Sequence, residues 1–270
     1  MRTSTSGGSV GSGAGGAGTD RPQATTHSTD KATTRVVALV AVLVGLSACA
    51  PRPLLERAIR SRGGPLHTVV RRVDADVRAG FPGMWHWRSV FMLPDRYAWS
   101  LDTNTEPYHY LFDGRTVRAF IGGRLVSVVD TPGAPLRSHA RLTAVVNLDA
   151  LRLPGVSVAE LATGELPPGA VAGLRVAFAS DGAQYRLGFD RDVLLILVTG
   201  PVDLTPFGRG EMTVRFADFR AVRGMRMPFR AAWTFGETPL AEERVVAVCT
   251  NVAGVTDDAF RDPGSLPACD

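Results

Sequence analysis

Histidine side chains could bind a metal ion or transfer a proton in this protein. The histidines after residue 48 are His67, His86, His109 and His139. No pair has a His-x-x-x-His or His-Glu-x-x-His spacing, so a zinc site would need ligands from distant parts of the chain. His86 stands between Trp85 and Trp87, and in a strand the two tryptophans point to one face and His86 to the other. We therefore expect a solvent-facing His86 and no metal site.

Other sequence patterns for catalysis are missing. Lys31 is the only lysine, so the chain that follows it has no P-loop or Schiff-base lysine. After residue 48 there is no Gly-x-Ser-x-Gly sequence. Gly122-Gly123 and Gly208-x-Gly210 are turn glycines, because no strand-to-helix crossover follows them. These patterns favour a binding protein over an enzyme and predict no cofactor.

Cys49 ends a segment that is typical of an exported bacterial lipoprotein. A short basic flank precedes the apolar run Val36 to Leu46, and Leu46-Ser47-Ala48-Cys49 looks like a lipobox. A run of about 11 residues is too short for a membrane span of about 20. We predict that residues 1–48 are a removed leader and that Cys49 carries a lipid anchor. The alternative is a plain secretory signal with Cys49 incidental.

Cys249 and Cys269 are an even pair once Cys49 is assigned to the lipid. Because an exported protein reaches an oxidising compartment, we predict a disulfide that pins the C-terminal tail onto the strand carrying Cys249. Two unpaired thiols are the alternative, because the sequence does not show that the two Cα atoms come within bonding reach.

The charge of the chain argues against a nucleic-acid partner. Removal of residues 1–48 takes away four basic and two acidic side chains, which leaves 26 basic and 24 acidic residues and a net charge of about +2. The remaining 222 residues suffice for one sizeable core. We expect one domain, 66–270, preceded by a lipid-anchored tether and short helix, 49–65.

The elements that must position these residues are mostly strands. Alternating apolar and polar residues between turn signals predict strands over 69–77, 84–93, 97–101, 107–112, 116–121, 125–130, 173–179, 183–189, 193–199, 210–220, 225–235 and 241–251. Asp113-Gly114 and Gly122-Gly123 predict hairpins. Apolar periodicity predicts helices over 53–62 and 135–151, and 154–169 is expected to be a loop. The predicted fold class is mostly β (α+β), a curved antiparallel sheet with a short helical cover.

Several local sequences, taken in order, resemble the LolA and LolB superfamily of outer-membrane lipoprotein carriers and receptors. They are Leu93-Pro94-Asp95-Arg96-Tyr97, Phe112-Asp113-Gly114-Arg115, Phe216-Ala217-Asp218-Phe219-Arg220 with Gly224 and Met227-Pro228, and Asn251 with Asp257-Asp258-Ala259-Phe260. The resemblance spans about 66 to 263. It implies a half-open β-barrel of about 11 strands, a helical lid and a concave apolar cavity for acyl chains.

A lipid anchor would make the chain more similar to LolB than to the soluble carrier LolA. LolB carries a protruding loop with an exposed apolar residue that helps deliver cargo, whereas the corresponding turn here, 102–107, is polar. Delivery by that turn is therefore not expected.

Large aromatic residues of the predicted strands are the candidate cavity lining. They are Trp85, Trp87, Tyr97, Trp99, Tyr110, Phe112, Phe178, Phe216 and Trp233. A filled core closed by the helix explains the same residues. We expect a lipoprotein of the bacterial envelope, facing the periplasm from the outer membrane, that binds or transfers lipids or the acyl chains of lipoproteins. The alternative is a sensory or scaffolding lipoprotein that docks a periplasmic protein partner, which a filled concave face and an exposed apolar convex patch would favour.

Overall fold

A computed structural model describes residues 52–102, 106–129, 134–204 and 207–269. Cys49, the leader and most of the predicted tether lie outside the described residues.

Two antiparallel meanders make up one sheet. The first consists of β1 (Thr68–Val77), β2 (Gly83–Met92), β3 (Arg96–Asp102), β4 (Tyr108–Phe112), β5 (Val117–Ile121) and β6 (Arg124–Val129). The second consists of β7 (Val156–Glu160), β8 (Ala172–Phe178), β9 (Gln184–Phe189), β10 (Leu195–Leu204), β11 (Gly208–Val222), β12 (Met225–Phe235) and β13 (Thr238–Thr250). The described sheet thus has thirteen strands, where the family resemblance implied about 11.

The first and last strands join the two meanders. The strand order is β6-β5-β4-β3-β2-β1-β13-β12-β11-β10-β9-β8-β7, and β1 pairs with β13 so that Arg71 lies opposite Val248. The edges, β6 and β7, do not pair with each other, so the sheet stays open. This arrangement confirms the predicted mostly-β, half-open antiparallel architecture.

Turn chemistry fixes the narrow hairpins. Gly122 and Gly123, which connect β5 to β6, have φ angles of 55° and 77°. Two consecutive positive φ angles suit the mirror-image turn that matches the twist of antiparallel strands, and glycine adopts them without a Cβ clash. The hairpin predicted from these two residues is therefore present.

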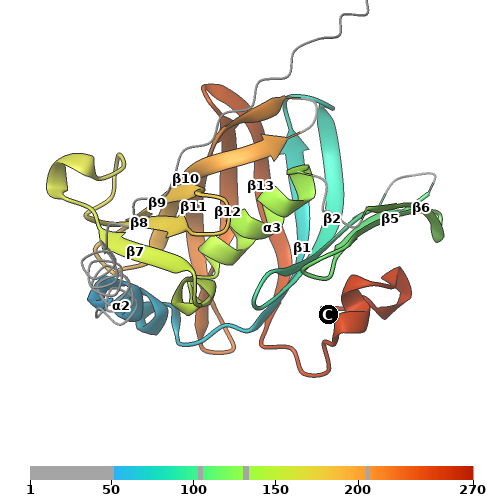
Figure 1. Cartoon of the computed structure of the whole chain (residues 1–270), viewed down its shortest axis with the longest axis horizontal. Coiled ribbons are helices and arrows are strands. Elements are labelled where there is room, and N and C mark those ends of the chain that lie inside the picture. Colours follow the sequence, from blue (N-terminus) through green and yellow to red (C-terminus); the bar gives the residue numbers. More distant parts are fainter. Residues whose placement is uncertain (1–51, 103–105, 130–133, 205–206, 270) are drawn as a thin grey trace, which may run out of the picture. The chain divides into compact units, whose positions relative to one another are not determined.

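Two helices cover the inner face of the sheet. Helix α2 (Pro53–Arg62) begins with a proline, whose missing N–H is not needed in the first turn, and ends at Gly63 with φ 116°. Helix α3 (Ala134–Val146) connects the two edge strands β6 and β7 and therefore has to cross the sheet (Figure 1). No helix in the described part of the chain is long and apolar enough to span a membrane.

Helix α3 ends before the predicted boundary at residue 151. Leu148 has φ 61°, and a separate 3₁₀ turn, Asp149–Arg152, follows it. The apolar periodicity runs through this break because Leu148 and Leu151 are both buried, although the backbone is no longer helical. Periodicity alone therefore overestimates the helix.

The prediction of a continuous loop over 154–169 is wrong, because β7 lies within it. Val156 and Val158 alternate with the small residues Ser157 and Ala159, and β7 pairs with β8 through five residue pairs, such as Val158 with Val176. The strand is short and lies at an edge, where only one ladder of hydrogen bonds is available. Such a strand has a weak sequence signal.

The inner and outer faces of the sheet have separate cores. On the inner face, Leu142 and Val145 of α3 and Leu55 of α2 pack with β8 to β12. On the outer face, the C-terminal tail places Phe260, which is fully buried, against Val70, Val90 and Leu111. The disulfide between Cys249 of β13 and Cys269, with sulfur atoms 2.08 Å apart, holds this tail to the sheet. The predicted pairing of these cysteines is therefore present.

Candidate functional site

A cavity of about 80 Å³ lies between α3 and the centre of the sheet. Its apolar wall includes Leu66, Val69, Phe91, Leu142, Val146, Leu194, Leu195, Phe216, Phe219, Met227 and Trp233. Its polar wall includes Arg62, Arg71, Ser89, Thr143, Asn147 and Arg226. Pockets for small ligands usually measure about 300–1,000 Å³. The helices and the strand side chains thus fill most of the inner face and leave a small amphipathic space.

Strand register brings the central lining residues together. Val69 lies opposite Phe91, and Arg71 lies opposite Ser89, in the β1–β2 pair. Directly opposed residues share a face of the sheet, so these four side chains face the helix. Leu142 and Val146 are four residues apart on α3 and therefore lie on one side of it, over the cavity.

Phe216 and Trp233 are the two predicted lining residues that border this cavity. The other seven are placed elsewhere: Trp85, Trp87, Tyr97, Trp99, Tyr110, Phe112 and Phe178. Period-two alternation assigns a face to each residue, but it does not say which part of that face remains uncovered.

Trp87, Trp99 and Tyr110 form an aromatic row on the inner face of β2 to β4. The Trp87 and Trp99 ring centroids are 6.1 Å apart, and those of Trp99 and Tyr110 are 5.6 Å apart. These three residues are half-buried. They pack against one another across neighbouring strands, as aromatic cross-strand pairs usually do, rather than around the cavity.

Tyr97 and Phe112 belong to the core beneath α3. They are 2% and 4% exposed and pack with Ala140 and Ala144 of the helix, whose small side chains allow a close approach. The helix covers them and so removes them from the cavity wall. Phe178, in β8, lies instead beneath the Arg141 guanidinium, which is 4.2 Å from its ring centre.

Trp85 lies near the β1–β2 turn, away from the cavity. Its ring centroid is 6.4 Å from that of Phe81, which is 65% exposed. Met84, in the same hairpin, is 63% exposed. The end of this hairpin is therefore an exposed apolar surface. Alternation alone had assigned its Trp85 to the cavity lining.

His139 connects α3 to the cavity wall. Its ring stacks on Trp233 with a centroid distance of 5.6 Å and an interplanar angle of 14°, and it lies 5.3 Å from the Tyr97 ring. Burial, with a smaller contribution from the Arg71 charge, lowers the pKa of His139 to about 4. The imidazole is therefore neutral at pH 7. A single histidine in an amphipathic helix carries no sequence signal for this role.

Arg71 and Glu243 form a loose ion pair beside the cavity. Arg71 Nη1 is 3.9 Å from Glu243 Oε2, which is beyond hydrogen-bond distance. The Glu243 side chain is almost fully buried. Burial raises the pKa of the Glu243 carboxyl, and the Arg71 charge partly opposes that rise. Sequence analysis missed this pair because its members are far apart in the chain.

Asp149 fixes one end of the cavity. Its Oδ2 accepts hydrogen bonds from Arg62 Nη2 at 2.5 Å and from the Leu66 backbone N–H at 2.9 Å. Arg62 also donates to the Asn147 carbonyl oxygen. One buried carboxylate thus joins the end of α2, the segment before β1 and the end of α3. Charge-assisted bonds of this kind are about twice as strong as neutral ones.

The remaining histidines lie apart from the cavity. His67 is exposed. His86 faces solvent, as predicted, with 58% of its side chain exposed and its Nδ1 2.7 Å from Asp74 Oδ1. His109 Nδ1 lies 2.9 Å from Ser100 Oγ, but Ser100 is only 1% exposed and a substrate could not reach it. Within the described ranges, no three His, Cys, Asp or Glu residues are grouped as a metal site would require.

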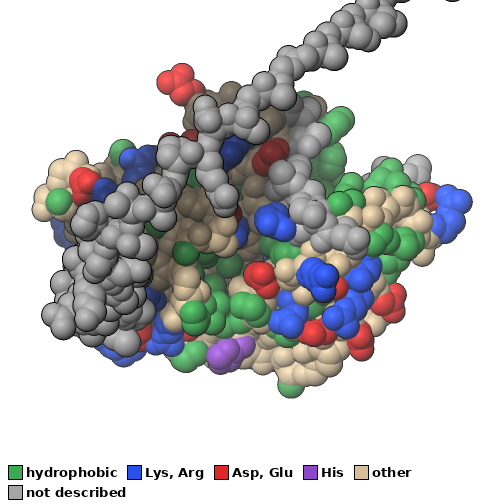
Figure 2. Space-filling view, in the orientation of Figure 1, with side chains coloured by type: hydrophobic (Ala, Val, Ile, Leu, Met, Phe, Trp, Pro, Cys, Tyr) green, Lys and Arg blue, Asp and Glu red, His purple; other side chains and the backbone are tan. Residues whose placement is uncertain are grey.

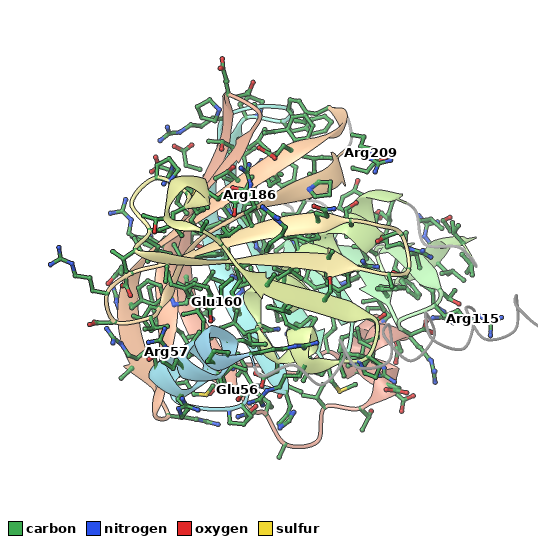
Figure 3. The ribbon with its side chains drawn as sticks, turned by 60° about the vertical axis from the view of Figure 1, so that its left-hand side comes forward. Glu56, Arg57, Arg115, Glu160, Arg186 and Arg209 are labelled. Carbon is green, nitrogen blue, oxygen red and sulfur yellow. A yellow bond between two sulfur atoms is a disulfide. The ribbon has the colours of Figure 1, made fainter. Side chains whose placement is uncertain are left out.

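Edge strand β6 presents the main exposed apolar surface among the described strands. Leu125, Val126, Val128 and Val129 are 41–53% exposed. Apolar side chains gather over β5 and β6 at the right of Figure 2. The opposite end of the sheet is charged by comparison. Figure 3 labels Glu56 and Arg57 on α2 and Glu160 on β7 at this end.

No family model and no curated protein matches this chain. Similarity appears at the level of structure. A domain named for outer-membrane lipoprotein sorting, from Vibrio parahaemolyticus, matches with a TM-score of 0.51 and 11% identity over 78% of this chain and 97% of that one. A LolA superfamily protein from Nitrosomonas europaea gives 0.51 and 11% over 77% and 95%.

A third structure with this arrangement is a DUF1329 family protein from Desulfovibrio piger, with a TM-score of 0.52 and 11% identity over 77% of this chain and 96% of that chain. At this identity the likeness establishes the fold and not the ligand. Almost the whole length of each neighbour is matched, and this chain shares with them one curved antiparallel sheet. The chain has the LolA-like fold.

Proposed function

We propose that this protein binds or transfers lipids, or the acyl chains of lipoproteins, in the cavity beneath α3, without catalysis. The observation that carries the proposal is an apolar cavity between a helix and the inner face of an open sheet in a LolA-like fold. Transfer of a methylene group from water to such a surface gains about 0.8 kcal/mol. A few methylenes therefore provide useful affinity.

A complete acyl chain needs more room than about 80 Å³, so α3 must shift when such a ligand enters. Polar contacts of α3 with the sheet are few enough for such a shift. Ser138 Oγ accepts a hydrogen bond from the Asp203 backbone N–H at 3.0 Å, and Arg141 pairs with Asp181 at 3.1 Å and lies over the Phe178 ring. The rest of the described interface is largely apolar packing and the His139 stack. Apolar packing can be replaced by ligand contacts without leaving polar groups unsatisfied.

Filling the cavity tests this proposal. Val146→Trp places an indole in the lining of α3, so binding of a fluorescent acyl probe should fall about tenfold or more, because the ligand loses apolar contact area. Val171→Trp makes the same change at a valine that is 53% exposed, and it should leave binding unchanged. Probe titration and native mass spectrometry provide the measurements.

Equal binding by both tryptophan variants and the wild type would place the lipid site elsewhere. Absence of co-purified lipid together with absence of probe uptake by the wild type would refute lipid binding altogether. Circular dichroism of each variant is the check that the fold is intact.

The location proposed for this activity is the bacterial envelope, with Cys49 as the lipid anchor in the outer membrane and the domain facing the periplasm. Support comes from the lipobox-like sequence and the paired cysteines of the C-terminal region. Intact mass spectrometry of membrane-purified protein should find an acylated Cys49 as the first residue. Cys49→Ala should release the protein from the membrane fraction, whereas an unmodified Cys49 in the wild type would contradict the anchor.

A second candidate is docking of a periplasmic protein, supported by the exposed aliphatic residues of β6 and the largely filled inner face. Val128→Lys would weaken such docking and leave acyl binding unchanged. Crosslinking in intact cells, comparing this variant with the wild type, distinguishes the two candidates.

A further inference from the structure

Several hydrogen-bond donors in the described cavity wall lack a protein acceptor in good geometry, among them Arg62 Nε and Asn147 Nδ2. The Arg71 guanidinium makes no hydrogen bond to a described residue and reaches Glu243 only at 3.9 Å. Trp233 Nε1 is buried and approaches the Glu243 carboxyl, whose pKa it lowers, although the two groups miss normal hydrogen-bond geometry. Ser89 is 4% exposed and lies directly opposite Arg71. Buried polar groups nearly always have partners, supplied by protein, water or ligand.

The other two arginines of the wall are already engaged. Arg62 bonds to Asp149 and to the Asn147 carbonyl oxygen inside the protein. Arg226 lies 3.4 Å from Asp192 at the surface. Arg71 is therefore the arginine of the described wall whose carboxylate partner is the most distant.

Apolar groups surround these donors. Phe91 lies two residues from Ser89 on β2 and faces the same side of the sheet. Leu142 of α3 and Phe216 of β11 complete this part of the wall. Hydrogen-bond donors beside an apolar surface match a ligand that has an oxygen-rich head and a hydrocarbon tail.

We infer that the cavity takes an anionic amphiphile, whose carboxylate or phosphate oxygens accept hydrogen bonds from Arg71, with Ser89 as a further donor. Its chain lies along Phe91, Leu142 and Phe216. The inference rests on the proposed lipid-binding function and adds the chemistry of the head group. A neutral lipid of the same chain length would make the same apolar contacts but weaker hydrogen bonds, because bonds to a charged acceptor are about twice as strong.

Glu243 is compatible with an anion at this place. Burial raises the pKa of its carboxyl, so an anion meets less negative charge there than beside an exposed glutamate.

The test compares charged and neutral probes with matched chains. Palmitate is paired with 1-hexadecanol, and lysophosphatidate with the corresponding monoacylglycerol, each titrated below its critical micelle concentration. The wild type should bind each anion about tenfold or more tightly than its neutral counterpart. A preference for the carboxylate pair alone, or for the phosphate pair alone, identifies the head group.

Arg71→Met should abolish this preference and leave binding of the neutral probes within about twofold of the wild type. Arg72→Met is the matched control, since Arg72 is the next residue of β1, exposed on the opposite face of the strand. It should retain the preference. Glu243→Gln, which keeps the shape of the side chain, should bind palmitate at least as tightly as the wild type.

Equal affinity of the wild type for charged and neutral probes would overturn the inference, whatever the variants do, while leaving the proposed lipid binding intact. An equal loss of all probes in Arg71→Met would assign Arg71 to packing and would also overturn it. Failure of the wild type to bind any probe would refute the proposed function itself.

Discussion

At the scale of single residues, the inner face depends on polar side chains enclosed by aromatic and aliphatic ones. His139 lies between Tyr97 and Trp233, and Asp149 accepts hydrogen bonds from Arg62 and Leu66. Each joins a helix or a turn to the sheet beside the cavity. Removal of one partner from such a buried contact lowers the free energy of unfolding by more than the contact itself contributes. The reason is that the remaining polar group stays buried without a hydrogen-bond or charge partner.

The pKa of His139 predicts a pH-dependent stability. Its value of about 4 lies below the ordinary value of 6.5, so the unfolded chain takes up the proton first as pH falls. The contribution of His139 is therefore present above pH 6.5 and is lost as pH falls toward 4. Between pH 7 and pH 4.5 the free energy of unfolding should decrease by about 2 kcal/mol from this residue.

His139→Phe isolates this effect, because it keeps an aromatic ring and removes the titration. Urea unfolding at pH 7 and pH 4.5 should show a pH-dependent loss about 2 kcal/mol smaller in the variant than in the wild type. Other titrating groups, including Glu243, are common to both proteins. The same pH dependence in the two proteins would contradict a buried neutral imidazole.

At the scale of elements, two segments without strands close the two faces of the sheet. Helix α3 covers the inner face, and the tail from Asn251 to Cys269 covers the outer face of the first meander. The tail has little regular structure beyond the 3₁₀ turns Asp257–Phe260 and Pro263–Ser265. Its position therefore depends on burial of Phe260 and on the Cys249–Cys269 disulfide.

Loss of the disulfide should destabilise the protein by about 3 kcal/mol, because the bond closes a chain segment with a sequence separation of 20 and restricts the unfolded state. Urea unfolding of the double variant Cys249→Ala, Cys269→Ala measures the change. Acyl-probe binding by the folded variant should be retained, since the tail and the cavity are on opposite faces.

Reduction provides the control for this prediction. A reductant should lower the unfolding midpoint of the wild type to about that of the double variant and leave the variant itself unchanged. A wild type that is insensitive to reductant under these conditions would contradict a stabilising role of the bond.

At the scale of the whole sheet, strand order explains why a helix covers the cavity. The chain leaves the first meander at edge strand β6 and enters the second at the opposite edge, β7. The connection must cross the sheet, and the inner face is where α3 crosses it (Figure 1). The cavity lies where β1 and β2 of one meander meet β11 and β12 of the other beneath that helix. Entry of the proposed lipid would thereby be coupled to the connection between the two halves.

Local sequence patterns determined the strands, the hairpins and the cysteine pairing. Alternation of apolar residues marks most of the strands, Gly122-Gly123 marks a hairpin, and the pair of cysteines left once Cys49 is assigned to the lipid predicts a disulfide. These features depend on residues close in sequence or on simple counting. The two wrong boundaries also have local causes. The strand β7 is short and lies at an edge, and the helical segment is broken at Leu148, because apolar periodicity does not reveal the positive φ angle of that residue.

The tertiary structure alone decided which side chains form the site. Alternation assigned Tyr97, Trp99 and Trp233 to the aromatic face of the sheet that was expected to line the cavity. The path of α3 buries Tyr97 and leaves Trp233 at the cavity. The approach of Arg71 to Glu243 likewise depends on the pairing of the first strand with the last. Contacts between residues so far apart in the chain follow from sheet curvature and helix placement, and short-range sequence periodicity carries no information about either.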